Sequence, residues 1–321
     1  MSLGRVFKLN SGYEIPAIGF GTWLSKPNEV GNAVEHALHT GYRHIDAAAL
    51  YANEQGVGSG WRKSGVPRNQ IFITSKLWNT HHHPAHVEEA LDKSLSDLQT
   101  DYLDLYLIHW PVSFEYTTSL YPIDPTTKRI KLADVSIGET WAAMEKLVTT
   151  GKVRSIGVSN FTIEKVEELL RTAKIMPAVN QYEGHPYLQQ PKLLKFLKDK
   201  GILPVSYSPR GNDFYEPPRL VHDPTVVEVA KRLGKDPFAL LLSWGVQRGT
   251  GVLAKSVNPA HIETNFQDFI IPDEEFETLN KLDRHHRYNY PSMGGVDVFG
   301  EQGQNVVERR AEETAAENRR Q

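Results

Sequence analysis

Short apolar runs alternate along the chain with longer segments in which apolar residues recur every three or four positions. The short runs are typical of buried strands, and the longer segments are typical of amphipathic helices. The predicted strands are residues 17–23, 44–48, 72–77, 103–110, 155–160, 178–182, 204–208 and 252–255. The predicted helices are residues 28–39, 84–98, 137–148, 162–173, 191–200, 224–233 and 238–248.

Strands that alternate with helices from one end of the chain to the other predict an α/β fold, a (β/α)8 TIM barrel. A short hairpin, 6–9 with 14–16, is expected to cap the bottom of the barrel. The alternative, a doubly wound sheet, usually carries a glycine-rich fingerprint after its first strand, and Gly19-Phe20-Gly21-Thr22-Trp23 lacks that spacing. We expect one domain over residues 1–321, with a core at about 8–283. An extra C-terminal helix and tail follow in 284–321, and the charged end of that tail is a solvated helix or disordered.

Composition excludes several classes of function. The formal net charge of −3 argues against a protein that binds nucleic acid or an anionic membrane. The printed sequence has no cysteine, which excludes disulfides, thiolate zinc sites and a cysteine nucleophile. No apolar run approaches the ~18 residues of a membrane span. We therefore expect a cytoplasmic protein, as a monomer or a dimer.

Four side chains with acid–base chemistry lie near the ends of three successive predicted strands: Asp46, Tyr51, Lys76 and His109. In a parallel barrel these ends meet at one mouth, where chemistry is usually placed. An ammonium beside Tyr51 is expected to lower the pKa of the phenol, and Asp46 is expected to keep the buried Lys76 charged. A neutral His109 would orient a carbonyl oxygen by hydrogen bonding. Such a group polarises a carbonyl and protonates the alkoxide that develops.

Each of these residues also has a structural interpretation. An acid or an amine near a strand end often serves packing alone, and a histidine behind an apolar strand is often a satisfied core residue. The run His81-His82-His83 suggests a metal site, but adjacent histidines on a loop do not face one way, so we expect no metal. A solvated loop, or one at the edge of the mouth, is the expected place for that run.

Six motifs follow one another in a characteristic order. They are GYRHID at 41–46 with Tyr51 and Asn53-Glu54, LIHWP at 107–111, GVSNF at 157–161, Asn180-Gln181 with HPY at 185–187, YSP at 207–209, and KSVNP at 255–259. This order resembles that of the aldo-keto reductases over residues 8–283, with the nearest resemblance to the fungal glycerol dehydrogenase and glyceraldehyde reductase branch. The resemblance implies that Asp46, Tyr51, Lys76 and His109 are catalytic and that the fold binds a nicotinamide coenzyme.

Motif position assigns the coenzyme contacts implied by this resemblance. Those at the nicotinamide end and the pyrophosphate are Gly21, Thr22, Trp23, Asp46, Ser159, Asn160, Gln181, Tyr207, Ser208, Arg210 and Asn212. Those at the adenosine 2′-phosphate and the adenine are Lys255, Ser256, Val257, Asn258, His261, Thr264 and Asn265. Without the resemblance, Ser159-Asn160 would equally suit a turn or a helix cap, and Tyr207 a rim aromatic.

The sequence departs from the family pattern at the coenzyme. His261 stands where an arginine is frequent, and Thr264 where an acidic residue is common. A histidine is largely uncharged at neutral pH, so it supplies less charge for a phosphate. Arg210 replaces a usual leucine and adds a cation. We expect NADPH to be preferred through Lys255 but less strictly, with NADH as the weaker alternative.

The expected substrate wall is aromatic and consists of Trp23, Tyr51, Trp78, His109, Trp110 and Phe114. Such a mouth suits small aldehydes, hydroxy-aldehydes such as glyceraldehyde, and aldoses. The predicted reaction is reversible reduction of a carbonyl to the alcohol, with the proton supplied by Tyr51. The alternatives are a xylose- or aldose-type sugar reductase, a regulatory subunit of the channel β-subunit kind, and a structural protein recruited from a reductase.

Overall fold

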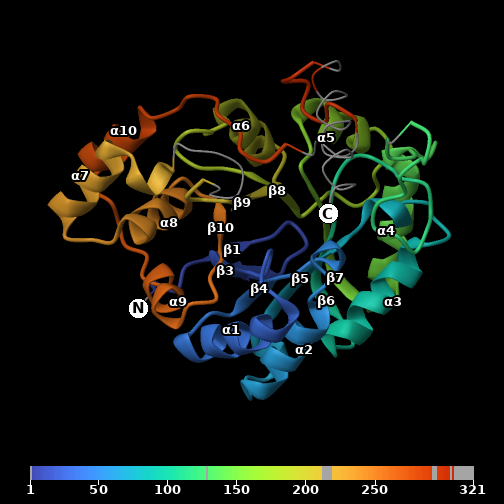
Figure 1. The fold of residues 1–321 in the computed structure, drawn as a ribbon, viewed down its shortest axis with the longest axis horizontal. Helices are drawn as coiled ribbons and strands as arrows, with labels where there is room; N and C mark the ends of the chain where they lie inside the picture. Colours follow the sequence, from blue (N-terminus) through green and yellow to red (C-terminus); the bar gives the residue numbers. More distant parts are fainter. Residues whose placement is uncertain (1, 128, 212–218, 291–294, 304–305, 307–321) are drawn as a thin grey trace.

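The computed structural model describes residues 2–127, 129–211, 219–290, 295–303 and 306. Eight parallel strands close into a barrel in the order β10-β3-β4-β5-β6-β7-β8-β9, which confirms the predicted fold class (Figure 1). The barrel strands are β3 Ile18–Gly21, β4 His44–Asp46, β5 Phe72–Leu77, β6 Leu103–Ile108, β7 Val153–Ser159, β8 Val179–Glu183, β9 Leu203–Tyr207 and β10 Gly251–Ala254. Asn212 and the chain end at 307–321 lie outside the described residues.

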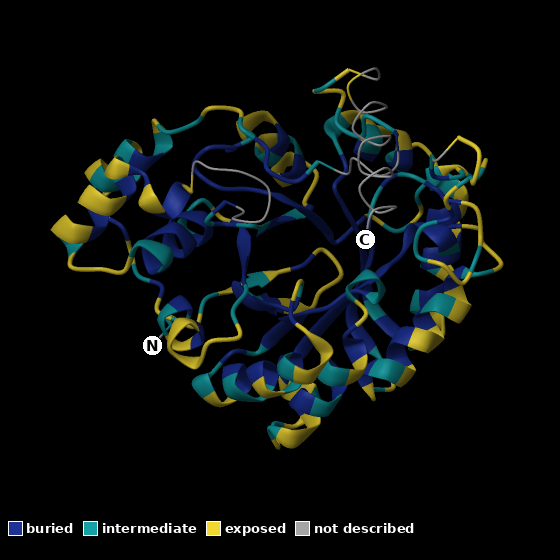
Figure 2. Ribbon diagram, in the orientation of Figure 1, coloured by how far each residue is buried: buried dark blue, intermediate teal, exposed yellow. Residues whose placement is uncertain are grey.

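Helices surround the barrel, and their buried faces point toward it (Figure 2). They are α1 Pro27–Thr40, α2 Glu54–Lys63, α3 Val87–Leu98, α4 Ile137–Thr149, α5 Ile163–Leu170, α6 Pro191–Asp199, α7 Pro224–Leu233, α8 Pro237–Gln247, α9 Pro259–Asn265 and α10 Asp273–Asn280. Short 3-10 turns are η1 Ala49–Tyr51, η2 Arg68–Gln70, η3 Asn79–His81 and η4 Leu220–His222. Over the ranges described above, no helix combines the length and the apolar character needed to cross a membrane.

Helices α2, α9 and α10 are not in the predicted set. In α2, three glycines argue against a helix. The structure shows what they permit. A Cβ on Gly56 would lie 2.9 Å from the carbonyl oxygen of Pro27, and one on Gly60 would overlap the carbonyl oxygen of Gly31. Helices α1 and α2 therefore pack with their backbones almost in contact. Close packing outweighs the poor helix propensity of glycine, which costs about 1 kcal/mol per residue.

The predicted hairpin forms between β1 Val6–Lys8 and β2 Glu14–Pro16, paired antiparallel. Its apolar side chains Leu9 and Ile15 are buried in one cluster with barrel residues that include Leu105 and Val205. The hairpin thus plugs one end of the barrel, as expected from its position in the sequence. The opposite end, where the strands terminate, is the one with room for chemistry.

Candidate active site

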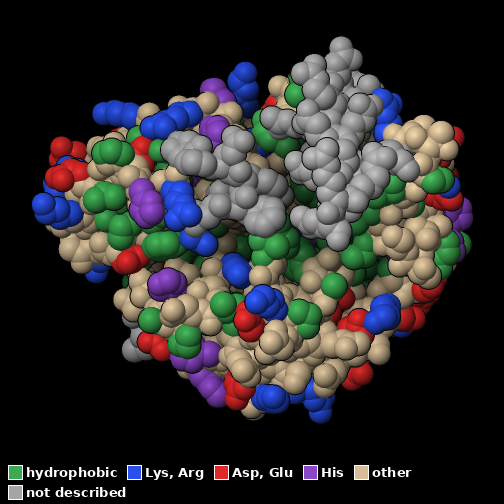
Figure 3. Space-filling view, in the orientation of Figure 1, with side chains coloured by type: hydrophobic (Ala, Val, Ile, Leu, Met, Phe, Trp, Pro, Cys, Tyr) green, Lys and Arg blue, Asp and Glu red, His purple; other side chains and the backbone are tan. Residues whose placement is uncertain are grey.

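A cavity of about 550 Å³ opens where the barrel strands end. Residues at or just past the ends of β3, β4, β7, β8, β9 and β10 line its wall, among them Gly21, Asp46, Ser159, Gln181 and Lys255. Hydrophobic side chains gather near the middle of the face that Figure 3 shows. The structure therefore brings the ends of strands far apart in sequence to one site.

Three of the four predicted catalytic residues form a cluster in which Asp46 and Lys76 are buried and Tyr51 is half-buried. The Lys76 ammonium donates to Asp46 Oδ1 at 2.5 Å and to the carbonyl oxygen of Ala47 at 2.9 Å, and its Nζ lies 3.4 Å from the Tyr51 hydroxyl. The Lys76 side chain is 0% exposed. Lys76 reaches the site because β5 pairs in parallel with β4, which places it beside the Asp46 strand end. A buried charge of this kind persists only with a partner, and Asp46 is that partner.

The pKa of Tyr51 does not follow the expectation from sequence. Burial raises the pKa of the phenol well above 10, and the negative charge of Asp46 raises it further. The positive charge of Lys76 is largely balanced by Asp46, with which it is paired. The prediction of a lowered pKa for Tyr51 is therefore wrong. Burial likewise lowers the pKa of Lys76, while Asp46 raises it. Tyr51 therefore holds its proton firmly until a stronger acceptor is placed beside it.

His109 completes the predicted set from the end of β6. Its ring centroid lies 5.8 Å from that of Tyr51 and 5.4 Å from that of Trp78, both edge to face. Burial lowers the pKa of His109 well below its usual value, and the charge of Lys76 lowers it further. The imidazole is thus neutral at neutral pH and can hydrogen-bond an oxygen without competing for its charge.

Side chains from the far side of the barrel fix the same group. Gln181 on β8 donates from Nε2 to the second carboxylate oxygen of Asp46 at 2.8 Å. Asn160 donates from Nδ2 to the carbonyl oxygen of His109 at 3.0 Å and accepts from the Tyr207 hydroxyl at 2.7 Å. Asn160 has φ +64°, the left-handed conformation that asparagine tolerates better than most residues. The chain therefore turns sharply at the end of β7, which points this amide across the mouth.

A protein-family model for the aldo/keto reductase family matches residues 17–284. The chain belongs to the aldo/keto reductase family. It is 45% identical over 299 to 304 residues to two fungal relatives, an oxidoreductase of Schizosaccharomyces pombe and the D/L-glyceraldehyde reductase of Hypocrea jecorina, and each alignment covers 91% of this chain and 92 to 93% of the relative. It is 42% identical to the glycerol 2-dehydrogenase (NADP(+)) of Saccharomyces cerevisiae over 92% of this chain and 97% of that protein. The aldose reductase of Schistosoma japonicum has the same fold, with a TM-score of 0.87 and 40% identity over 93% of this chain and all of that one.

Aldo/keto reductases are oxidoreductases that use NAD(P)H, and most of the predicted coenzyme residues face the cavity. On its wall are Gly21, Thr22, Trp23, Asp46, Ser159, Asn160, Gln181, Tyr207, Ser208, Arg210, Lys255 and Asn265. Side-chain amides and hydroxyls at one end and two cations at the other are the donor set that a dinucleotide with phosphates requires. The residues present therefore fit this coenzyme.

Five predicted coenzyme residues do not line the cavity: Ser256, Val257, Asn258, His261 and Thr264. They lie on the turn into α9 and on α9 itself. Asn258 Oδ1 accepts from the amides of Ala260 and His261 and so caps this helix, and the Thr264 hydroxyl donates to the carbonyl oxygen of Ala260. The side chains of Asn258 and Thr264 thus bond within this helix. Their predicted contacts with coenzyme remain a prediction.

Arg210, the unusual cation of this aldo/keto reductase, packs on an aromatic ring. Its guanidinium carbon lies 5.0 Å from the ring centroid of Phe238, and that ring stacks with His261 at 6.2 Å. Burial lowers the pKa of Lys255, and the charge of Arg210 lowers it further. Two cations thus lie near one another at one end of the cavity, an arrangement that an anionic ligand stabilises.

The expected aromatic wall is present, because Trp23, Tyr51, Trp78, His109, Trp110 and Phe114 all line the cavity. The wall also contains residues that were not predicted, namely Leu50, Val112, Tyr121, Ile130, Asn289, Tyr290, Val296 and Val298. The long loop before α4 contributes Tyr121 and Ile130, and Trp78 Nε1 donates to the carbonyl oxygen of Leu120 at 2.7 Å in that loop. The sequence does not indicate that these residues line the cavity, because loops lack the hydrophobic periodicity from which helices and strands are predicted.

The histidine run is not a solvated loop throughout. His82 is buried, its Nδ1 lies 3.2 Å from the Ser113 hydroxyl, and its carbonyl oxygen accepts from the Thr140 hydroxyl at 2.9 Å. Burial lowers the pKa of His82 to about 3. His82 is therefore a neutral interior residue that joins the wall of the mouth to α4.

Proposed function

We propose that this aldo/keto reductase reduces small aldehydes, including hydroxy-aldehydes such as glyceraldehyde and aldoses, to alcohols with NADPH, and that the reaction is reversible. The observation that carries the proposal is the Lys76–Asp46–Tyr51 cluster around a buried ammonium, with a neutral His109 beside it at the mouth of an aromatic cavity. An ionised carboxylate, a shared ammonium and two neutral proton carriers suit addition to a carbonyl better than nucleophilic or metal chemistry.

In this proposal the four residues divide the work. His109 hydrogen-bonds the carbonyl oxygen and orients it toward Tyr51. When bound, the nicotinamide supplies the hydride to the carbonyl carbon. As negative charge develops on the oxygen, Tyr51 passes its proton to it, and the nearby Lys76 ammonium stabilises the phenolate left behind. Asp46 keeps Lys76 charged during this step, and aromatic side chains around the oxygen exclude water.

The raised pKa of Tyr51 supports the direction of this proton transfer. A phenol with a pKa above 10 stays protonated over the physiological range and is a ready donor only to a strongly basic oxygen. An alkoxide is such an oxygen, and a ground-state carbonyl is not. Tyr51 therefore acts only as the transition state develops, which is what efficient catalysis requires.

The preference for NADPH has support at the other end of the cavity. Lys255 and Arg210 both line it, and their charges act on one another. The 2′-phosphate is the extra anion that distinguishes NADPH from NADH, so two cations favour it. A relative at 42% identity is named for NADP(+). His261 stands where relatives often have an arginine; it is exposed and stacks on Phe238, which supports a preference that is not strict.

The substrate class rests on the size and lining of the mouth and on the relatives. Two relatives with 42 to 45% identity are named for glyceraldehyde and glycerol. An aromatic mouth walled by Trp23, Trp78 and Trp110 suits a short carbon chain with its hydroxyl groups.

The test is a spectrophotometric assay of NADPH and NADH oxidation with propanal, glyceraldehyde, xylose and benzaldehyde. We expect turnover with NADPH on several of these substrates and a higher kcat/KM with NADPH than with NADH. Tyr51→Phe should lower kcat by at least about 100-fold, the usual contribution of a positioned proton donor, with coenzyme binding retained by fluorescence quenching. The matched control is Tyr13→Phe, at an exposed tyrosine.

Each outcome separates the alternatives. A preference for NADH would refute the coenzyme assignment, and near-normal kcat in Tyr51→Phe would refute the role of Tyr51. Coenzyme binding without turnover on any carbonyl or alcohol would favour a regulatory subunit over an enzyme.

A further inference from the structure

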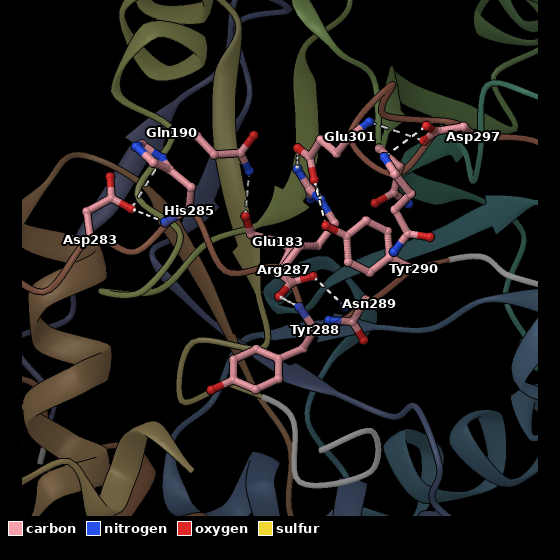
Figure 4. A network of polar contacts seen from close by, with 12 residues as sticks. Glu183, Gln190, Asp283, His285, Arg287, Tyr288, Asn289, Tyr290, Asp297 and Glu301 are labelled. Atoms are coloured by element: carbon pink, nitrogen blue, oxygen red, sulfur yellow. Dashed lines mark hydrogen bonds and ion pairs between the residues drawn. The ribbon is translucent and has the colours of Figure 1, made fainter. Parts of the chain in front are cut away.

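Part of the C-terminal segment is folded over the mouth of the barrel, although the sequence from about residue 284 shows neither helical nor strand periodicity. Two described stretches, residues 287–290 and 295–303, contribute Asn289, Tyr290, Val296 and Val298 to the cavity wall. The polar contacts that hold this segment fall into an inner and an outer group (Figure 4).

The inner group is centred on Glu183 at the end of β8. Its carboxylate accepts the backbone amides of Tyr288 at 2.8 Å and Asn289 at 2.9 Å, and it lies 2.8 Å from His185 Nε2. The Glu183 and His185 side chains are both 0% exposed. Burial raises the pKa of Glu183, but His185, the amide of Tyr288 and the charge of Arg287 together lower it below its ordinary value. This group fixes the start of the segment to the barrel itself.

The outer group is an ion pair between Arg287 and Glu301. The guanidinium donates to both carboxylate oxygens, at 2.9 and 2.8 Å, and the Tyr290 hydroxyl donates to one of them at 2.9 Å. The Arg287 side chain is 3% exposed, whereas that of Glu301 is 37% exposed. Phe299 packs on the guanidinium, with its ring centroid 3.7 Å away. A bidentate pair has a more specific geometry than a single contact, and removing one partner from a pair with a buried member leaves that member's charge uncompensated.

Asp297 fixes the position of Glu301 in this pair. Its carboxylate accepts the amides of Glu301, Gln302 and Gly303, at 3.3, 3.0 and 2.8 Å. The tight turn therefore presents the Glu301 carboxylate to Arg287, so that the two ends of the segment are tied together.

The tied segment reaches the site through aromatic contacts. The ring of Phe299 lies 6.0 Å from that of Trp110 and 6.3 Å from that of Tyr290. Trp110 follows His109 directly and lines the cavity. Phe299 thus lies in contact both with the Arg287 guanidinium and with the wall residues Trp110 and Tyr290.

We propose that the Arg287–Glu301 ion pair determines substrate size: it holds residues 295–303 as a closed outer wall that favours short carbonyl substrates over bulky ones. This proposal rests on the proposed reductase function and goes further by assigning specificity to a pair that touches neither substrate nor coenzyme. Both residues are positioning residues. Loss of the pair should move the wall and leave the proton donor in place.

The test compares Glu301→Gln with the unsubstituted enzyme on propanal and on 4-nitrobenzaldehyde. We expect KM for propanal to rise about 3- to 10-fold, the effect of losing roughly 1 kcal/mol of ordering in the wall. We expect kcat for propanal to stay within twofold and the ratio of kcat/KM for the two substrates to shift at least fivefold toward the bulky one. The matched control is Glu88→Gln, which removes one carboxylate from the exposed Lys152 pair. Arg287→Met tests the pair from the other side and should shift the ratio in the same direction.

A second measurement does not depend on turnover. Hydrogen–deuterium exchange should become faster at residues 295–303 in Glu301→Gln, while the amides of Tyr288 and Asn289, bound to Glu183, stay protected. Faster exchange with an unchanged substrate ratio would overturn the proposal, and so would an equal loss of kcat on both substrates with weaker NADPH binding. If the unsubstituted enzyme turned over no carbonyl at all, the proposed function itself would fail, which is a different outcome.

Discussion

The floor of the cavity and its outer rim are built in opposite ways. The floor consists of Asp46, Tyr51, Lys76 and His109, which stand on or next to barrel strands, are bonded to one another or in ring contact, and hold a charge without access to water. The rim consists of loops and the C-terminal segment, fastened by contacts such as the Arg287–Glu301 pair. Floor contacts cannot shift without disturbing the barrel, whereas rim contacts can. We therefore expect changes in the floor to act on kcat and stability, and changes in the rim to act on KM and on coenzyme affinity.

The largest effect should come from Lys76→Met. This change leaves Asp46 as an uncompensated buried carboxylate, which costs about 3–5 kcal/mol of unfolding free energy. It also removes the charge that stabilises the Tyr51 phenolate, so kcat should fall at least about 100-fold. Urea unfolding and steady-state kinetics measure the two effects, with Lys93→Met at an exposed ion pair as the control. Activity close to normal would contradict the expectation that changes in the floor act on kcat whereas changes in the rim act on KM.

Acid should weaken the interior before it weakens the rim. Burial lowers the pKa of His44 to about 4 and that of His82 to about 3, and it lowers the pKa of His109 as well. Between these values and the unfolded value of about 6.5, the unfolded chain binds more protons than the native protein. Stability is therefore complete above about pH 6.5 and is lost as the pH falls, by up to about 1.4 kcal/mol per pH unit for each histidine.

Urea unfolding from pH 7.5 to pH 4.5 measures this slope. His82→Gln should flatten it, and His285→Gln, at an exposed histidine of the C-terminal segment, should not. A slope that is the same in all three proteins would contradict the assignment to buried histidines.

Arg210→Leu should produce a smaller effect that is confined to the coenzyme. Removing one of two cations should raise Kd for NADP+ about fivefold, equivalent to roughly 1 kcal/mol, and leave Kd for NAD+ within twofold. Fluorescence quenching measures both constants, and 2′,5′-ADP serves as a probe of the phosphate contact alone. An equal change for both coenzymes would mean that Arg210 acts on the pyrophosphate or on the fold.

The smallest effect is expected away from both regions, at the end of α3. Gln99 is exposed and has φ +54°, a left-handed conformation that glycine adopts without strain. Gln99→Gly should therefore raise the free energy of unfolding by about 0.5–1 kcal/mol and leave kcat and KM unchanged. Thermal unfolding and parallel steady-state kinetics test this. Altered kcat or KM would show that the end of α3 also affects the active site.

The residues of the floor could be placed from sequence because the hydrophobic pattern shows where each strand ends. The apolar run 103–108 and the proline after Trp110 placed His109 at the end of a strand, and the same reasoning placed Asp46 and Lys76. What sequence could not supply was the balance of charge. The pKa of Tyr51 depends on whether Lys76 is shared with Asp46 and on how deeply the phenol is buried, and both are properties of the closed barrel.

The rim residues of the C-terminal segment could not be predicted, for a different physical reason. Tyr290, Val298 and Phe299 belong to a segment without helical or strand periodicity, and their positions depend on tertiary contacts made by Glu183 and Arg287. Helix α2 was not predicted because glycine disfavours a helix, although here its glycines allow the backbones of α1 and α2 to come into contact. In both cases a long-range contact overrides the local signal.

The hydrogen bond from Gln181 to Asp46 has a consequence for how the enzyme comes into being. All four residues proposed to act in catalysis belong to the first 109 residues, whereas the amide that holds the second oxygen of Asp46 arrives on β8. A nascent chain that has emerged as far as β6 carries all four groups, but its partial sheet has two open edges, and the second oxygen of Asp46 lacks the bond from Gln181. We therefore expect reductase activity only after β8 has joined the barrel and the bond from Gln181 to Asp46 has formed.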